Sequence, residues 1–151
     1  MNEFKSIDDV LDFAIAREEE SHKMYTDLAG KMKKQAMKEV FEDFAKQELG
    51  HKAKLLKVKE GKLLVSAEKK VMDLKIGDYL VDVEPTEKMS YQDALIVAMK
   101  KERAAFMLYS DLAESVSDEN LKNTFTSLAN EEARHKLRFE IIYDDKVLVW
   151  N

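Results

Sequence analysis

The amino-acid sequence predicts an all-α protein: an antiparallel four-helix bundle of two repeated helical hairpins, with a long crossover between the second and third helices. Three observations lead to this fold class. The 151-residue chain has one proline and four glycines, and its 45% hydrophobic and 36% charged residues favour long amphipathic helices over a sandwich or barrel. The chain also repeats internally, and apolar residues recur at helical spacing in each half. Its length suits a single domain, which we place at residues 1–151.

The internal repeat is found by placing the second half of the chain under the first with an offset of 84 residues. This offset aligns the sequence YTDLA, which begins at Tyr25, with YSDLA, which begins at Tyr109, and no gap is needed. Because a lone helical hairpin cannot cover its own apolar face, the two hairpins are expected to pair into four helices. The offset also makes the following pairs: Glu18 with Glu102, Phe41 with Phe125, Glu48 with Glu132, His51 with His135 and Leu55 with Phe139.

Each half contains two apolar stripes with spacings of three and four residues, which keep side chains on one face of a helix. All four stripes are interrupted at mid-length by a glutamate. Local signals mark the helix ends: Ser6, Ser90 and Ser117 are predicted N-caps, and Gly61 is a predicted stop for the second helix. We therefore expect helices at about residues 6–30, 35–60, 90–116 and 118–144.

Two segments lie outside these helices. The connection from Lys62 to Met89 is too long for a tight turn and suits a crossover along the bundle. The C-terminal sequence KVLVW, which ends at Trp150, has strand-like apolar content. We expect this tail either to fold back on the bundle or to fill a subunit interface.

The composition excludes several classes of function. Because the sequence has no cysteine, it has no disulfide framework, thiolate zinc site, cysteine-ligated iron centre or cysteine nucleophile. A formal net charge of -5 argues against nucleic-acid binding. The N-terminal sequence lacks the basic start and apolar run of a signal peptide, and no other segment is apolar enough to span a bilayer. We therefore expect a cytoplasmic protein that binds neither nucleic acid nor a membrane.

Six residues of the types that bind metals lie at one level of the predicted bundle. Residues three apart on a helix project about 60° from each other, so each glutamate of the two Glu-x-x-His pairs points into the same space as its histidine. Four ionised carboxylates buried together would repel each other, and each would cost several kcal/mol of desolvation. Two divalent cations would balance the four charges, with neutral imidazoles completing each shell. The candidate ligands are Glu18, Glu48, His51, Glu102, Glu132 and His135.

The alternative is that the repeated residues only pack the helices against one another and bind no metal. A single Glu-x-x-His pair in a glutamate-rich chain would be weak support for a metal site. Two such pairs in repeat register, each matched by a glutamate in the partner helix, favour metal binding. Glu131 also lies at a workable metal spacing from His135, but its repeat mate is Gln47. The register therefore favours Glu132.

Other polar residues near the six are expected not to bind metal. His22 lies one turn past Glu18, but its repeat mate is Phe106, so we expect a surface or supporting role rather than ligation. Glu19 and Glu20 point off the stripe and are interpreted as parts of solvated helix faces.

The six candidate ligands resemble the dinuclear carboxylate site of the ferritin-like superfamily. The nearer match is the erythrin domain of rubrerythrins, and the similarity covers about residues 6–144. The resemblance implies a ferritin-like topology with a non-haem di-iron or di-manganese centre. It also implies that Glu48 and Glu132 bridge the two ions, and that Glu18 and Glu102 are terminal ligands.

The resemblance includes Tyr25 and Tyr109, each seven residues after a lone glutamate. They could donate to ligand carboxylates or quench radicals, so both are candidate catalytic residues, although large aromatic residues at this spacing also serve as core. The sequence departs from the family at Ala105, where rubrerythrins commonly carry an extra glutamate; its repeat mate is Ser21. The sequence also lacks a cysteine-rich rubredoxin module, so electrons must come from an external donor.

The leading functional hypothesis is a di-iron oxidoreductase that reacts with hydrogen peroxide or dioxygen. Oxygen and nitrogen ligands suit iron or manganese, and zinc could occupy the site adventitiously. We expect two iron ions per chain, and a homodimer or higher homo-oligomer. Three alternatives stay open: iron oxidation or storage of the ferritin type, oxygenation of an organic or tRNA-borne substrate, and a metal-free bundle that serves as an interaction module.

Overall fold

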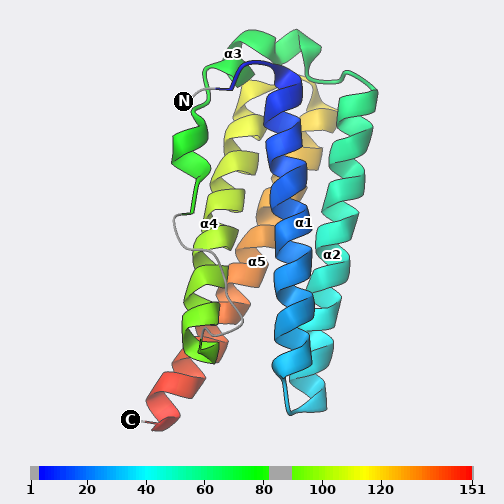
Figure 1. The fold of residues 1–151 in the computed structure, drawn as a ribbon. Helices are drawn as coiled ribbons and strands as arrows, with labels where there is room; N and C mark the ends of the chain where they lie inside the picture. Colours follow the sequence, from blue (N-terminus) through cyan, green and yellow to red (C-terminus); the bar gives the residue numbers. More distant parts are fainter. Residues whose placement is uncertain (1–3, 82–89, 151) are drawn as a thin grey trace. The chain divides into compact units, whose positions relative to one another are not determined.

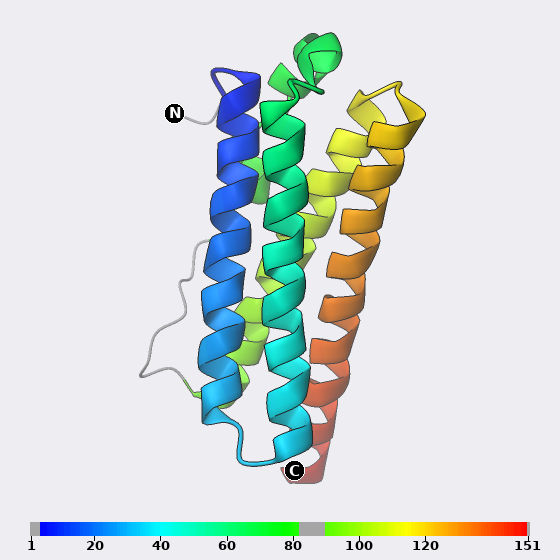
Figure 2. The same ribbon diagram turned by 90° about the vertical axis from the view of Figure 1, so that its right-hand side faces the viewer.

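The computed structural model describes residues 4–81 and 90–150, without the side chains of Ile76, Tyr91 and residues 144–150. The described chain is all-helical, as the sequence predicts, and contains four long helices. They form two compact units, one ending at Leu74 and the other beginning at Lys75. In each unit two long helices pack side by side as a hairpin (Figures 1 and 2). The helices are α1 (Ile7–Lys31), α2 (Gln35–Glu60), α4 (Tyr91–Ser115) and α5 (Glu119–Trp150).

The crossover contains short helices that the sequence pattern does not reveal. They are η1 (Val65–Ala67), α3 (Glu68–Met72) and η2 (Ile76–Tyr79). Within its unit α3 packs against α1, and η2 packs against α4. The contact of η2 with α4 includes Tyr79, whose side chain is 2% exposed and whose hydroxyl donates to Asp111 Oδ2 at 2.7 Å. Part of the expected crossover, including Pro85, lies outside the described residues.

Side-chain caps begin three of the long helices. The Ser6 hydroxyl accepts from the Asp9 N–H at 3.0 Å, and the Ser90 hydroxyl accepts from the Asp93 N–H at 3.1 Å, so these two predicted N-caps are confirmed. The prediction that Ser117 caps the fourth helix is wrong. Asp118 takes that role, because its carboxylate accepts from the N–H of Leu121 at 2.8 Å. A carboxylate also gains from the positive end of the helix dipole.

The predicted stop at Gly61 is confirmed, because Gly61 is the C-cap of α2. The Gly61 N–H donates to the Lys57 carbonyl at 3.0 Å, and the Leu63 N–H donates to the Val58 carbonyl at 3.1 Å. The left-handed backbone that often ends a helix falls one residue later, at Lys62, with a φ of 53°.

The strand-like interpretation of the C-terminal tail is wrong, and so is the end of the last helix near residue 144. Helix α5 continues to Trp150, so the tail does not fold back as a separate segment (Figure 1). The sequence from Glu119 onward contains neither glycine nor proline to end the helix. The valines of the tail lower helix propensity only slightly, by less than about 0.7 kcal/mol each.

The predicted apolar stripes form the buried face of each hairpin. Helix α5 buries every residue of its predicted stripe, which runs from Leu121 to Ile142. Partial burial is found at Ile7 and Met32 at the ends of the α1 stripe, at Met37 and Phe44 in the α2 stripe and at Ala105 in the α4 stripe. Burial of these faces is the main source of stability. The largest side chains exposed by less than 2% include Tyr25, Phe41 and Leu55 in the first hairpin, and Tyr109, Phe125 and Phe139 in the second.

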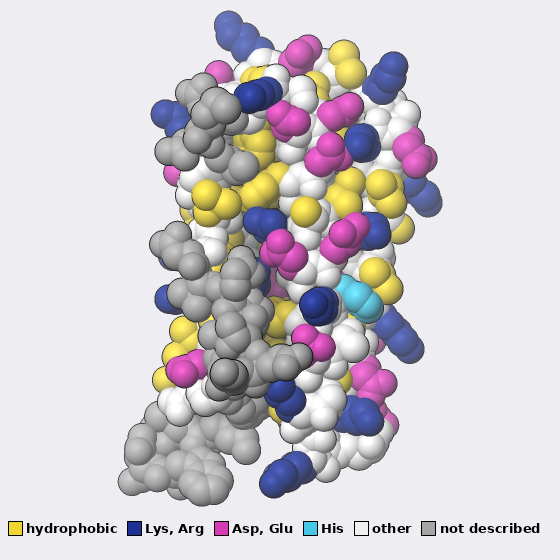
Figure 3. Space-filling view, viewed as in Figure 1, with side chains coloured by type: hydrophobic (Ala, Val, Ile, Leu, Met, Phe, Trp, Pro, Cys, Tyr) yellow, Lys and Arg dark blue, Asp and Glu magenta, His cyan; other side chains and the backbone are white. Residues whose placement is uncertain are grey.

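The outer surface carries charges of both signs. Figure 3 shows one face, on which acidic and basic side chains are interspersed among small apolar areas. Among the described residues, no helix combines the length and apolar character that spanning a lipid bilayer requires.

Candidate metal centre

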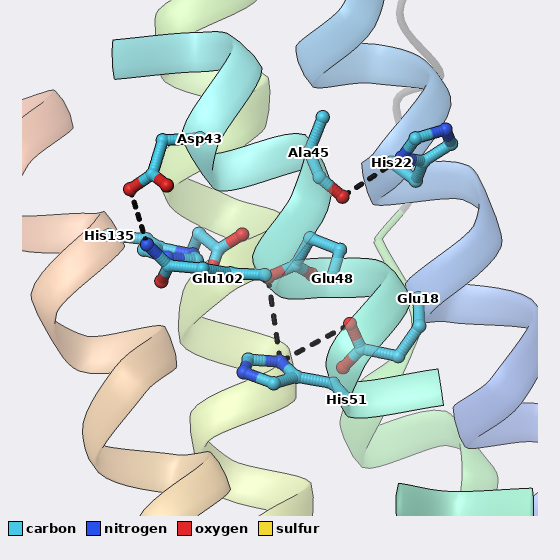
Figure 4. A network of polar contacts seen from close by, with 9 residues as sticks. Glu18, His22, Asp43, Ala45, Glu48, His51, Glu102 and His135 are labelled. Carbon is cyan, nitrogen blue, oxygen red and sulfur yellow. Dashed lines mark hydrogen bonds and ion pairs between the residues drawn. The ribbon is translucent and has the colours of Figure 1, made fainter. Parts of the chain in front are cut away.

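The first hairpin brings together Glu18, Glu48 and His51, which we call the first triad. Glu18 comes from α1, and the other two come from α2, where their spacing of three residues turns both side chains to one face. Each of the three is exposed by no more than 2%. The Nδ1 atom of His51 faces both carboxylates, at 3.4 Å from Glu18 Oε2 and 3.6 Å from Glu48 Oε1 (Figure 4).

The second hairpin brings together Glu102, Glu132 and His135, which we call the second triad. Glu102 comes from α4, and the Glu-x-x-His pair comes from α5. Both glutamates are 0% exposed and His135 is 2% exposed. The Nδ1 atom of His135 lies 3.6 Å from Glu102 Oε2. The two triads therefore occupy equivalent positions of the repeat and share the same composition.

Each triad fits a divalent metal ion in its donor chemistry. Within each triad every residue offers one ligand atom, and these atoms all lie within 4.8 Å of one another. Bonds of about 2.0–2.2 Å to one ion place two ligand atoms no more than about 4.4 Å apart, so small side-chain movements would suffice. Carboxylate oxygen and imidazole nitrogen suit iron and manganese. Two carboxylates also balance the charge of one divalent ion.

Comparison with known protein families identifies the family of this chain. The family model described as Rubrerythrin matches residues 9–143. The chain belongs to the rubrerythrin family. Among curated protein sequences, none matches this rubrerythrin-family chain.

Two solved structures have the same architecture as this rubrerythrin-family chain. One, from Thermotoga maritima, is described as a ferritin-like diiron-carboxylate protein; it is 19% identical, has a TM-score of 0.75, and the match covers 97% of this chain and 99% of that one. The other is a hypothetical protein from Pyrococcus furiosus, 25% identical with a TM-score of 0.69, and that match covers 94% and 90% of the two chains. The predicted ferritin-like bundle is thereby confirmed.

Polar residues that flank the first triad in this rubrerythrin bundle have other partners. His22 is partly buried, and its Nδ1 atom lies 2.9 Å from the backbone carbonyl of Ala45 in α2 (Figure 4). Glu19 pairs with Lys52 at 2.9 Å, and Glu20 pairs with Arg17 at 2.7 Å. The side chains of Glu19 and Glu20 are 54% and 38% exposed, as expected for solvated helix faces.

Neither Ala105, where rubrerythrins commonly carry an extra glutamate, nor its repeat mate Ser21 supplies a carboxylate. Ser21 is buried in α1, with 7% of its surface exposed, and Ala105 is partly buried in α4. Tyr25 and Tyr109 are almost fully buried, at 0% and 1% exposure. The ring of Tyr25 also packs edge-on against Phe44, with centroids 5.7 Å apart. Both tyrosines are therefore part of the hydrophobic core, and their catalytic role stays a prediction.

Two contacts between segments far apart in the chain have no local signature in the sequence. The role of His22 beside the ligands is expected from its position, but its partner Ala45 is not, because Ala45 lies in another helix. The bond between Tyr79 and Asp111 is likewise unexpected. The sequence does not distinguish Asp111 from its repeat mate Asp27, and only the structure shows that Asp27 is exposed and Asp111 partly buried.

Proposed function

We propose that this rubrerythrin-family protein is a di-iron oxidoreductase that reduces hydrogen peroxide or reacts with dioxygen. The observation that carries the proposal is the pair of equivalent Glu-Glu-His triads, each almost fully buried and each of the composition that suits iron or manganese. We propose all six residues as ligands of two metal ions. From the family resemblance, Glu48 and Glu132 are proposed to bridge, and Glu18 and Glu102 to be terminal.

In the proposed reaction the protein would hold the metal ions between buried carboxylates, away from water. Buried carboxylates stabilise the higher oxidation state of a bound ion, and the apolar residues around them limit the escape of reactive oxygen species. The bound metal pair would supply two electrons, one from each ion. Hydrogen peroxide would take up these two electrons and two protons and leave as two molecules of water.

After each reaction the oxidised metal pair would have to be reduced again by electrons from outside the site. The sequence has no cysteine, and therefore none of the ligands of a rubredoxin-type iron centre. We propose that an external electron donor returns two electrons after each turnover. The oligomeric state of the protein also stays a prediction.

Anaerobic loading with ferrous iron tests the proposal. We expect about two iron ions per chain, a change in absorbance when one equivalent of hydrogen peroxide is added, and consumption of that peroxide. The variant Glu132→Gln should lose iron and the absorbance change. The neighbouring variant Glu131→Gln is the matched control, because Glu131 lies next in sequence but is only partly buried. Two ions that stay ferrous in the presence of both oxidants would contradict the proposal.

A second candidate function is iron handling of the ferritin type. Ala105 favours it, because rubrerythrins commonly carry an additional glutamate at this position and alanine supplies no ligand. Titration with ferrous iron in air distinguishes the two functions. An oxidoreductase should hold about two ions however much iron is added, whereas a storage protein should accumulate many more per chain in a large assembly, measurable by light scattering.

A further inference from the structure

The one histidine outside the triads forms a link between the two helices of the first hairpin. His22 lies four residues after Glu18 on α1, and Ala45 lies three residues before Glu48 on α2. The separation of 2.9 Å between His22 Nδ1 and the Ala45 carbonyl oxygen requires the ring to donate from Nδ1. By helix rise, the link lies about 6 Å along α1 from Glu18 and about 4.5 Å along α2 from Glu48.

The geometry of the first triad depends on how α1 and α2 are aligned along their axes. Glu48 and His51 belong to one helix, so their relative position does not depend on how α1 and α2 are aligned. Glu18 belongs to the other helix, and its distance of 3.4 Å from His51 changes if one helix slides along the other. A constraint on this sliding therefore acts on Glu18 more than on Glu48.

The His22 link is better suited to this constraint than the ion pairs between the same helices. Lys52 with Glu19 and Lys59 with Asp12 also join α2 to α1, but the acidic side chains of these pairs are 54% and 56% exposed. Such pairs join flexible side chains in water and tolerate movement. The His22 ring is short and stiff, and its acceptor is a backbone carbonyl fixed within a helix at the buried residue Ala45.

In the second hairpin the position equivalent to His22 cannot form this link. The repeat mate of His22 is Phe106, which is 38% exposed and has no hydrogen-bond donor on its side chain. The triads thus share a composition but are supported differently. A variant at position 22 should therefore affect one metal ion and spare the other.

We infer that His22 is a positioning residue for the first triad: by donating to the Ala45 carbonyl it fixes the alignment of α1 with α2 and so places Glu18 opposite His51. The inference rests on the proposed metal-binding function. His22 does not touch the metal in this role. It acts through the helix that carries Glu18.

Cobalt(II) binding to the metal-free protein tests the inference by calorimetry and visible absorption. We expect the wild type to bind two ions and His22→Ala to bind one of them at least about tenfold more weakly, the usual minimum cost of losing a residue that supports a ligand. His22→Asn should restore affinity to within about threefold of the wild type, because its amide nitrogen can take the place of Nδ1. Phe106→Ala should leave both ions unchanged.

Each outcome separates the inference from the proposed function. If the wild type binds no cobalt, the metal-binding proposal fails. If the wild type binds two ions and His22→Ala binds both with wild-type affinity and absorption, the positioning role is wrong, even where the melting temperature falls. Should His22→Ala not fold, His22→Phe, which copies the second hairpin, replaces it. If His22→Asn loses as much cobalt affinity as His22→Ala, or as His22→Phe where that variant is used, the inference is also overturned.

Discussion

The two hairpins hold equivalent triads, but different contacts surround them. In the first hairpin, His22 joins α1 to α2 through the Ala45 carbonyl. In the second, Tyr79 of the crossover donates to Asp111 of α4. The ligand types recur at the same spacing because the chemistry of a metal site needs them. The surrounding contacts hold the helices, and the two hairpins use different residues for this.

The aspartates at positions 27 and 111 illustrate this divergence. They occupy the same place in the YTDLA and YSDLA sequences, so their helices present them alike. Asp27 is exposed. Asp111 accepts a hydrogen bond from a tyrosine that is 2% exposed. Only the second hairpin therefore uses this position to attach the crossover to a helix.

The largest expected effect tests whether the two cores are equivalent. Phe41 and Phe125 are repeat mates, and both are 0% exposed. We expect Phe41→Ala and Phe125→Ala each to lower the free energy of unfolding by about 3–5 kcal/mol, because each leaves a cavity. Urea denaturation followed by circular dichroism measures both. Phe106→Ala is the control and should cost less than about 1 kcal/mol, since Phe106 is 38% exposed. A cost confined to one hairpin would contradict equivalent cores.

The next effect tests whether the two triads are equivalent. We expect His51→Gln and His135→Gln each to lower the binding affinity for one of the two metal ions by about 100-fold or more, equal to about 2.7 kcal/mol. The affinity for the other ion should not change. The double variant should retain neither. Elemental analysis after gel filtration, together with calorimetric titration of manganese(II), measures these losses. Loss of both ions from either single variant would show that the triads bind metal only as one unit.

Periodic features account for what the sequence predicts well. The stripes of α1, α2, α4 and α5 and the buried positions of the six candidate ligands follow from spacing, because a helix repeats its faces regularly. The bonds from His22 to Ala45 and from Tyr79 to Asp111 join segments 23 and 32 residues apart in the chain. Such bonds depend on tertiary packing and leave no local pattern. The extension of α5 to Trp150 was missed for a related reason: β-branched residues suit strands, but a helix already formed continues through them.

A smaller effect is expected at the Tyr79 link. We expect Tyr79→Phe to lower the free energy of unfolding by about 1–2 kcal/mol at pH 8, because it leaves the partly buried Asp111 carboxylate without this donor. Chemical denaturation at pH 8 measures the loss. Asp27→Asn is the control on the equivalent exposed residue and should change stability by less than about 0.5 kcal/mol. A loss as large at position 27 would show that the link is not what distinguishes the hairpins.

The same tyrosine is expected to make the stability of the folded protein fall as the pH rises above about 10. Burial, and next the hydrogen bond to Asp111, raise the pKa of Tyr79 above its ordinary value. The folded protein therefore keeps this proton where the unfolded chain, with a tyrosine pKa of about 10, releases it. The stabilisation is complete below about pH 10 and is lost as the pH rises further, by up to about 1.4 kcal/mol per pH unit. Tyr79→Phe should flatten the decline between about pH 10 and 11.5; an unchanged slope would contradict the raised pKa.

The smallest effect compares how the helices begin. Ser6→Ala in the first hairpin and Ser90→Ala in the second should each cost about 1 kcal/mol, because each removes the acceptor for a first-turn N–H. In the second hairpin, Asp118→Ala should cost about as much, whereas Ser117→Ala should cost almost nothing, since the side chain of Asp118 accepts from Leu121. Thermal unfolding of the four variants in parallel measures these differences. The contrast between positions 117 and 118 isolates the cap itself, because both residues are exposed and adjacent; equal costs there would mean that the fourth helix begins one residue earlier in solution.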